Sequence, residues 1–132
     1  MVKLRSLTAA LIAGAIPAAA GAEPLSGAEI AARAGEFRGD TLSFRGFESH
    51  IWRLLPGGEA RAVVSLKRGY SALTAVTVEF GDSGSWRIEG NTLCVQWAGP
   101  NARFSGCYSA DAQQGNHVRL VGPARWEGTL DR

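Results

Sequence analysis

The chain has few of the residues that usually carry metal or redox chemistry. Its 132 residues contain two cysteines, Cys94 and Cys107, and two histidines, His50 and His117. Two histidines exclude a three-histidine zinc centre, and two thiols without a nearby histidine make a poor zinc site. Phosphate-binding loops, nucleotide-binding fingerprints, the H-E-x-x-H motif and cysteine–histidine nucleophile patterns are also absent. We therefore expect no metal, no cofactor and no catalytic residue.

An excess of positive charge is lacking as well. The chain has 14 Lys and Arg against 12 Asp and Glu, and two of the bases are Lys3 and Arg5. Residues 23–132 are therefore formally neutral, and their bases, all arginines apart from Lys67, form no run. Nucleic acids and anionic membranes select basic patches. We expect no nucleic-acid partner.

The longest apolar stretch lies at the amino end and is shorter than the roughly 20 residues that a membrane span needs. Lys3 and Arg5 precede this alanine-rich run, and small residues lead up to Ala22. This order predicts a secretory signal peptide over residues 1–22, cleaved between Ala22 and Glu23. The chain is then a bacterial exported protein, periplasmic or secreted, with no membrane anchor after signal removal.

The remaining residues, 23–132, are predicted to form one domain that begins with a short helix over Gly27–Ala34. Ser26 and Glu29 match the S-x-x-E capping box, in which each side chain satisfies a free backbone N–H of the first turn. Leu25 and Ile30 occupy the flanking staple positions.

After the helix, short runs rich in β-branched and aromatic residues alternate with glycine- and proline-containing turns. Strands of this length and spacing predict a mostly β fold, a small antiparallel β-barrel or sandwich with one short N-terminal α-helix. The expected strands are Phe37–Phe47, Ile51–Leu55, Ala60–Leu66, Leu73–Phe80, Ser85–Glu89, Thr92–Trp97, Arg103–Ser109 and His117–Val121.

A hairpin is expected around Pro100 and Asn101. If these two residues form a tight turn, Trp97 lies opposite Phe104, and Cys94 lies opposite Cys107. A non-hydrogen-bonded pair has Cα atoms about 4.5 Å apart, which a disulfide accepts. An even number of cysteines in an exported chain also favours a disulfide. A longer loop would shift this register, and a reduced pair is the alternative.

The segment Gly81–Gly84 spells Gly-Asp-Ser-Gly, the residues around the nucleophile of chymotrypsin-like proteases. A triad would need a histidine beside Ser83, and His50 is the histidine that precedes it. Each of the four residues also favours turns. We interpret the segment as an ordinary turn.

Glu48 and His50 would share one face of a strand, which permits an acid/base or metal pair. Such pairs are mostly solvated surface neighbours, which is the interpretation we prefer. Four tryptophans either line a ligand cavity or fill the core. They are Trp52, Trp86, Trp97 and Trp126.

Three segments lie in an order typical of one family. They read Leu-Ser-Gly-Ala-Glu-Ile at residues 25–30, Leu-Pro-Gly-Gly-Glu at residues 55–59, and Gly-Ser-Trp-Arg-Ile-Glu-Gly-Asn-Thr-Leu-Cys-Val-Gln-Trp at residues 84–97, with Cys107 following. Over these residues the chain resembles the exported proteobacterial domain-of-unknown-function family 995. The second segment departs from the family, which has a Pro-Asp-Gly turn there. The resemblance implies export and a β fold, and it implies no reaction.

Three functional hypotheses remain open. The first is a non-catalytic binding module for a small apolar or amphiphilic ligand. The second is an inhibitor or interaction protein for a hydrolase such as lysozyme or a protease, for which residues 67–71 are the candidate loop. The third, an enzyme that uses Ser83 or Glu48 with His50, ranks last. The partner is thus an unknown small molecule or protein, and the ligand-binding residues are not predicted.

Overall fold

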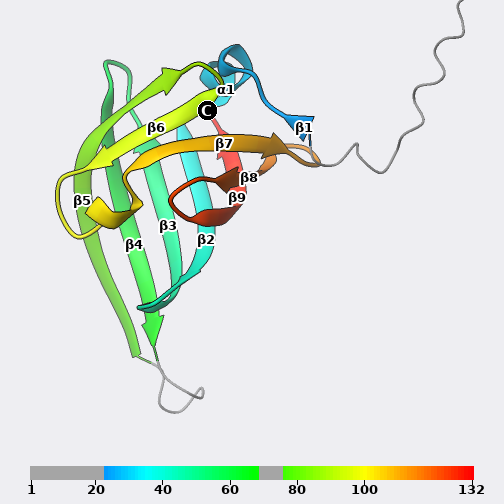
Figure 1. Ribbon diagram of the computed structural model, residues 1–132. Helices are drawn as coiled ribbons and strands as arrows, with labels where there is room; N and C mark the ends of the chain where they lie inside the picture. Colours follow the sequence, from blue (N-terminus) through cyan, green and yellow to red (C-terminus); the bar gives the residue numbers. More distant parts are fainter. Residues whose placement is uncertain (1–22, 69–75) are drawn as a thin grey trace, which may run out of the picture.

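The computed structural model describes residues 23–68 and 76–132 (Figure 1). They form a closed antiparallel β-barrel of eight strands with one extra strand and one short α-helix. The predicted fold class is confirmed, and of its two alternatives, barrel and sandwich, the structure is the barrel. The barrel strands are β2 (Glu36–Ser43), β3 (Gly46–Leu54), β4 (Glu59–Arg68), β5 (Val76–Glu89), β6 (Thr92–Trp97), β7 (Gly106–Ala112), β8 (His117–Val121) and β9 (Arg125–Asp131).

Each barrel strand pairs with its neighbours in sequence, and β9 closes the barrel by pairing with β2. The extra strand β1 (Glu23–Pro24) pairs with the end of β7. β9 was not among the strands predicted. No helix in the described part of the chain is long and apolar enough to cross a membrane. The predicted signal peptide, residues 1–22, lies outside the described residues.

The helix α1 (Gly27–Arg33) closes one end of the barrel, beside the β5–β6 turn (Figure 1). The predicted capping box is present: the Glu29 amide donates to Ser26 Oγ at 3.1 Å, and the Ser26 amide donates to Glu29 Oε1 at 2.8 Å. Leu25 and Ile30 are both buried, and Ile30 has no exposed surface. α1 therefore acts as an apolar plug that joins the barrel core.

Aromatic and aliphatic side chains fill the barrel interior. The Trp52 ring lies 5.5 Å from the Trp97 ring and 5.2 Å from the Trp126 ring, measured between centroids. An eight-stranded barrel is just wide enough for its side chains to fill it. The inward-facing apolar and aromatic residues of the barrel strands with at most 2% exposure are Phe37, Trp52, Ala60, Val64, Leu93, Val95, Trp97, Tyr108, Ala110, Val118, Leu120, Trp126 and Leu130.

The predicted strand Phe37–Phe47 is wrong, because the chain turns back between β2 and β3. Ser43 Oγ accepts a hydrogen bond from the Arg45 amide at 3.0 Å, and Gly46 adopts a positive φ of 123°. A serine hydroxyl that binds a nearby amide makes a local turn. Phe44 and Arg45, at the centre of this turn, carry no turn signal of their own.

The interpretation of Gly-Asp-Ser-Gly as a turn is also wrong, since residues 81–84 lie within the continuous strand β5. A Cβ atom on Gly84 would come within 1.9 Å of the Gln96 carbonyl oxygen. Asp82 accepts hydrogen bonds from the amides of Gly99 at 2.9 Å and Asn101 at 2.7 Å. The segment therefore holds the β6–β7 connection against β5.

The predicted register of the β6–β7 hairpin is confirmed, and its predicted turn is wrong. Cys94 lies opposite Cys107 and forms a disulfide with it, with Cα atoms 3.9 Å apart. The connection is longer than two residues and contains a 3-10 turn, η5 (Ala102–Phe104). Trp97 therefore does not pair with Phe104 in the ladder, and its amide donates to Ser105 Oγ at 2.8 Å instead.

Candidate functional site

Glu48 and His50 lie on the face of β3 that points into the barrel. Their exposed fractions are 0% and 1%, so the interpretation of the pair as solvated surface neighbours is wrong. Alternation along β3 sends Glu48, His50 and Trp52 inward together. The same alternation was visible in the sequence, but which face is covered depends on how β3 pairs with β2 and β4.

The Glu48 carboxylate is held by three side chains. Arg45 donates from Nη2 to Oε1 at 2.8 Å and from Nε to Oε2 at 2.9 Å, in the two-pronged geometry typical of strong arginine–carboxylate pairs. Ser43 Oγ donates to Oε2, and His50 Nε2 lies 2.9 Å from Oε1. Burial alone would raise the pKa of Glu48, but the hydrogen bonds from Arg45, Ser43 and His50 outweigh it and lower the pKa to about 2.

The protonation of His50 follows from its two partners. Trp52 Nε1–H donates to His50 Nδ1 at 3.0 Å, and an indole nitrogen is a donor only. Nδ1 must therefore accept, and the ring proton sits on Nε2, from which it donates to Glu48. Burial lowers the pKa of His50, against the opposing effect of Glu48. The imidazole is neutral at pH 7.

The buried network of Ser43, Arg45, Glu48, His50 and Trp52 anchors the β2–β3 turn to the barrel interior. Both carboxylate oxygens and both ring nitrogens have protein partners. Arg45, whose side chain is 15% exposed, extends the network to the Pro100 carbonyl at 3.4 Å. A substrate or metal ion would have to displace one of these partners to reach Glu48 or His50.

Ser83 is not brought to His50. Ser83 is exposed on the outer face of β5, opposite Arg61 of β4, whereas His50 points inward from β3. The two side chains therefore lie on opposite faces of the barrel wall. His117, at the start of β8, is exposed.

A groove of about 780 Å³ lies near the β2–β3 turn, where the pairing between β2 and β9 ends. The ladder between β2 and β9 ends at Asp40 and Glu127, and beyond it Thr41 Oγ1 donates to the Arg125 carbonyl at 2.7 Å. The groove lies between this end of β2 and the β8–β9 turn. Its apolar lining comprises Leu42, Phe44, Phe47, Phe104, Pro123 and Ala124.

Three apolar side chains of this groove are exposed. Leu42 and Phe44 are 79% and 80% exposed, and Phe47, the cross-strand partner of Leu42, is 46% exposed. Clustered apolar side chains at a surface mark sites for ligands or partners more often than single ones do. Sequence reasoning missed the groove, because its walls come from segments that are distant in the chain.

Two arginines line the groove with the apolar residues. The Arg103 guanidinium lies 3.8 Å from the centre of the Phe44 ring, a cation–π contact that holds both side chains in place. Ser43 and Phe104 connect the groove to the buried network. Ser43 donates to Glu48, and the Phe104 ring packs edge-on against His50 with centroids 5.3 Å apart.

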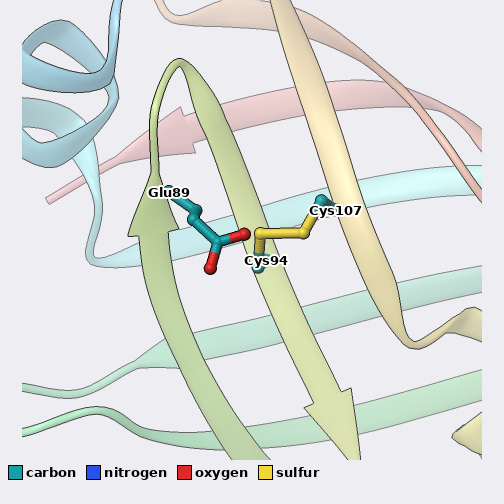
Figure 2. A group of neighbouring side chains, drawn as sticks. All are labelled: Glu89, Cys94 and Cys107. Carbon is teal, nitrogen blue, oxygen red and sulfur yellow. A yellow bond between two sulfur atoms is a disulfide. The ribbon is translucent and has the colours of Figure 1, made fainter.

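The disulfide lies on the outer face of the barrel beside Glu89 (Figure 2). The Glu89 carboxylate and the two sulfur atoms lie within 4.8 Å of one another. Both sulfurs are committed to the disulfide, so they offer no thiolate to a metal ion in this state. Figure 2 shows the Glu89 side chain directed toward the Cys94 sulfur.

Two further predictions concern tryptophans and a loop. Trp52, Trp97 and Trp126 belong to the packed core, and Trp86 packs against it with its Nε1 donating to the Leu55 carbonyl at 2.8 Å. Of the candidate loop, Lys67 and Arg68 end β4, and residues 69–71 lie outside the described residues.

Searches against family models, curated proteins and solved structures found no match to this chain. The resemblance to family 995 therefore stays a prediction.

Proposed function

We propose that this chain is a non-catalytic binding protein that holds a small apolar or amphiphilic molecule in the groove beside the β2–β3 turn. The observation that carries the proposal is the groove of about 780 Å³ with Leu42, Phe44 and Phe47 exposed along it. Small-molecule sites commonly measure about 300–1,000 Å³ and have mostly apolar linings with a few polar groups. Because aromatic side chains pack the interior, the proposal assigns the ligand to the surface groove and not to the barrel core.

Contacts within the protein fix the shape of the groove in the absence of a ligand. The β2–β3 turn that carries Phe44 is fixed from below by Arg45 and Ser43, which bind the buried Glu48 carboxylate. Arg103 stacks on Phe44 from the side. A preformed site loses less conformational entropy on binding, so this rigidity supports a binding role.

The second candidate is an inhibitor or interaction protein for a hydrolase. Phe44 stands at a hairpin tip, is 80% exposed and is stacked by an arginine. Aromatic and arginine side chains dominate the binding energy of many protein interfaces. A protein partner would cover the same residues, and the experiment below separates the two.

Export stays part of the proposal. The predicted signal peptide at residues 1–22 supports it, and so does the disulfide, because such bonds persist in oxidising compartments. The periplasm and the cell exterior both fit.

The test is calorimetric titration with decanol, below its solubility limit, of the protein and two serine variants. Phe44→Ser removes an exposed ring from the groove, and Val63→Ser removes an exposed side chain from the outer face of β4 (53% exposed) as a matched control. We expect decanol to bind the parent and Val63→Ser alike, and to bind Phe44→Ser at least several-fold more weakly.

Absence of decanol binding to the parent would contradict a small-ligand site. Capture of a hydrolase by the parent, lost in Phe44→Ser, would then establish the interaction protein instead. Equal decanol binding to all three proteins would place the ligand elsewhere.

A further inference from the structure

We propose that the groove selects an amphiphile with an anionic head, a carboxylate on a single alkyl chain, through Arg103 and Arg125. This inference rests on the proposed function and names the chemical class of its ligand. Both arginines line the groove and are exposed.

The charges around the groove leave these two guanidinium groups unneutralised. Neither Arg103 nor Arg125 forms an ion pair with any residue in the described ranges, 23–68 and 76–132. The two carboxylates of the groove make other contacts, and only that of Glu127 is an ion pair. Asp40 accepts from the Ser49 hydroxyl at 2.7 Å, and Glu127 is paired with Arg119 at 2.6 Å.

The placement of Arg103 suits an acidic head beside an apolar chain. Its guanidinium lies 3.8 Å from the Phe44 ring centre and 5.3 Å from that of Phe104. Stacking uses the flat face of the group, and the N–H groups on its edge remain able to bind a carboxylate with two hydrogen bonds. Leu42 and Phe47, paired across β2 and β3, offer the adjoining surface for the alkyl chain.

The groove fits one free molecule better than a membrane surface. About 780 Å³ is the size of a site for a single small ligand. Membrane docking draws on clusters of four to eight basic residues, whereas residues 23–132 are formally neutral and their bases form no run.

The experiment compares three molecules with the same ten-carbon chain: decanoate, decanol and decyltrimethylammonium, each below its micelle-forming concentration. Calorimetric titration at low ionic strength should give decanoate about tenfold tighter binding than decanol, as expected for charge-assisted hydrogen bonds. Decyltrimethylammonium should bind more weakly than decanol. Added salt should reduce the preference for decanoate.

The double variant Arg103→Gln/Arg125→Gln should bind decanoate no tighter than decanol. Arg53→Gln, which changes an exposed arginine of β3 outside the groove, should keep the preference. Decanol binding as tight as decanoate binding would overturn this inference and leave the proposed function standing. Failure of all three molecules to bind would overturn both. Binding to phosphatidylglycerol vesicles without binding to decanoate would also overturn the inference.

Discussion

Trp52 determines which nitrogen of His50 carries the ring proton. A protonated Nδ1 would face the Trp52 N–H, donor against donor, so the indole opposes the charged imidazole. The Glu48 carboxylate acts in the opposite direction from the other side of the ring. Burial and the Trp52 N–H thus keep His50 neutral against the effect of Glu48, and its two hydrogen-bond partners together fix one tautomer.

Replacing Trp52 by phenylalanine should destabilise the protein by about 1–3 kcal/mol, since His50 Nδ1 loses its donor within the core. The same change removes the indole that opposes protonation, so the pKa of His50 should rise. Urea unfolding measures the first effect, and nitrogen chemical shifts of the imidazole against pH measure the second.

Trp97→Phe is the matched control, because the Trp97 Nε1 atom is buried without a partner among the described residues. An unchanged pKa of His50 in Trp52→Phe would show that the indole does not oppose protonation of the imidazole.

Among the elements, β5 combines two roles along its length. Its inward-facing residues complete the barrel wall, and Asp82 fixes the loop between β6 and β7 through the backbone amides of Gly99 and Asn101. The loop in turn supplies Arg103 and Phe104 to the groove. A protease-like motif thus serves a structural purpose here.

Asp82→Ala should loosen the β6–β7 loop. The amides of Gly99 and Asn101 lose their acceptor, so their hydrogen exchange should quicken, with a stability loss of about 1–3 kcal/mol. Amide exchange followed by NMR is the measurement. Ser83→Ala, one residue away and exposed, should leave both amides as protected as in the parent, and similar exchange in Asp82→Ala and the parent would contradict the role of Asp82.

The double variant Cys94→Ala/Cys107→Ala tests the β6–β7 hairpin. The two cysteines are 13 residues apart, and a loop of that length predicts a loss of about 3 kcal/mol in unfolding free energy. Urea unfolding of the oxidised parent, the reduced parent and the variant separates the bond from the substitution. Equal stability of all three would show that the ladder alone holds the hairpin.

Some features of these elements could be predicted from the sequence and others could not. The capping box and the cysteine register followed from local patterns, since both depend on residues within one turn or one hairpin. The β2–β3 turn was missed because Phe44 and Arg45 are poor turn residues that a serine hydroxyl and Gly46 support. The burial of Glu48 depends on which face of β3 the closed barrel covers, and the groove is built from segments that are distant in the chain. No local pattern encodes either feature.

For the whole molecule, acid should unfold the barrel through two groups in succession. His50 has a folded-state pKa below its ordinary 6.5, so the unfolded chain binds this proton more readily and stability falls as the pH drops below that value. Glu48 contributes about 3 kcal/mol above its ordinary pKa of 4.5, and this is lost as the pH falls toward about 2.

Urea unfolding at about pH 7, about pH 5 and about pH 3 measures both effects. Glu48→Gln should be less stable than the parent at neutral pH and should lose less stability below about pH 4.5. Glu59→Gln, an exposed carboxylate of β4, is the control for the general effect of a lost charge. Unfolding profiles of Glu48→Gln and the parent that run parallel down to about pH 3 would contradict the role of Glu48.

The pairing of β2 with β9, which closes the barrel, affects the order in which the chain folds. Glu36, at the start of β2, pairs with Asp131, at the end of β9, so the first barrel strand made is completed by the last. Hairpins between neighbouring strands can form while the chain emerges. Closure of the barrel needs β9 as well as β2, and contacts between residues so far apart in sequence slow folding. The free edge of β2 therefore stays unpaired until β9 has been made.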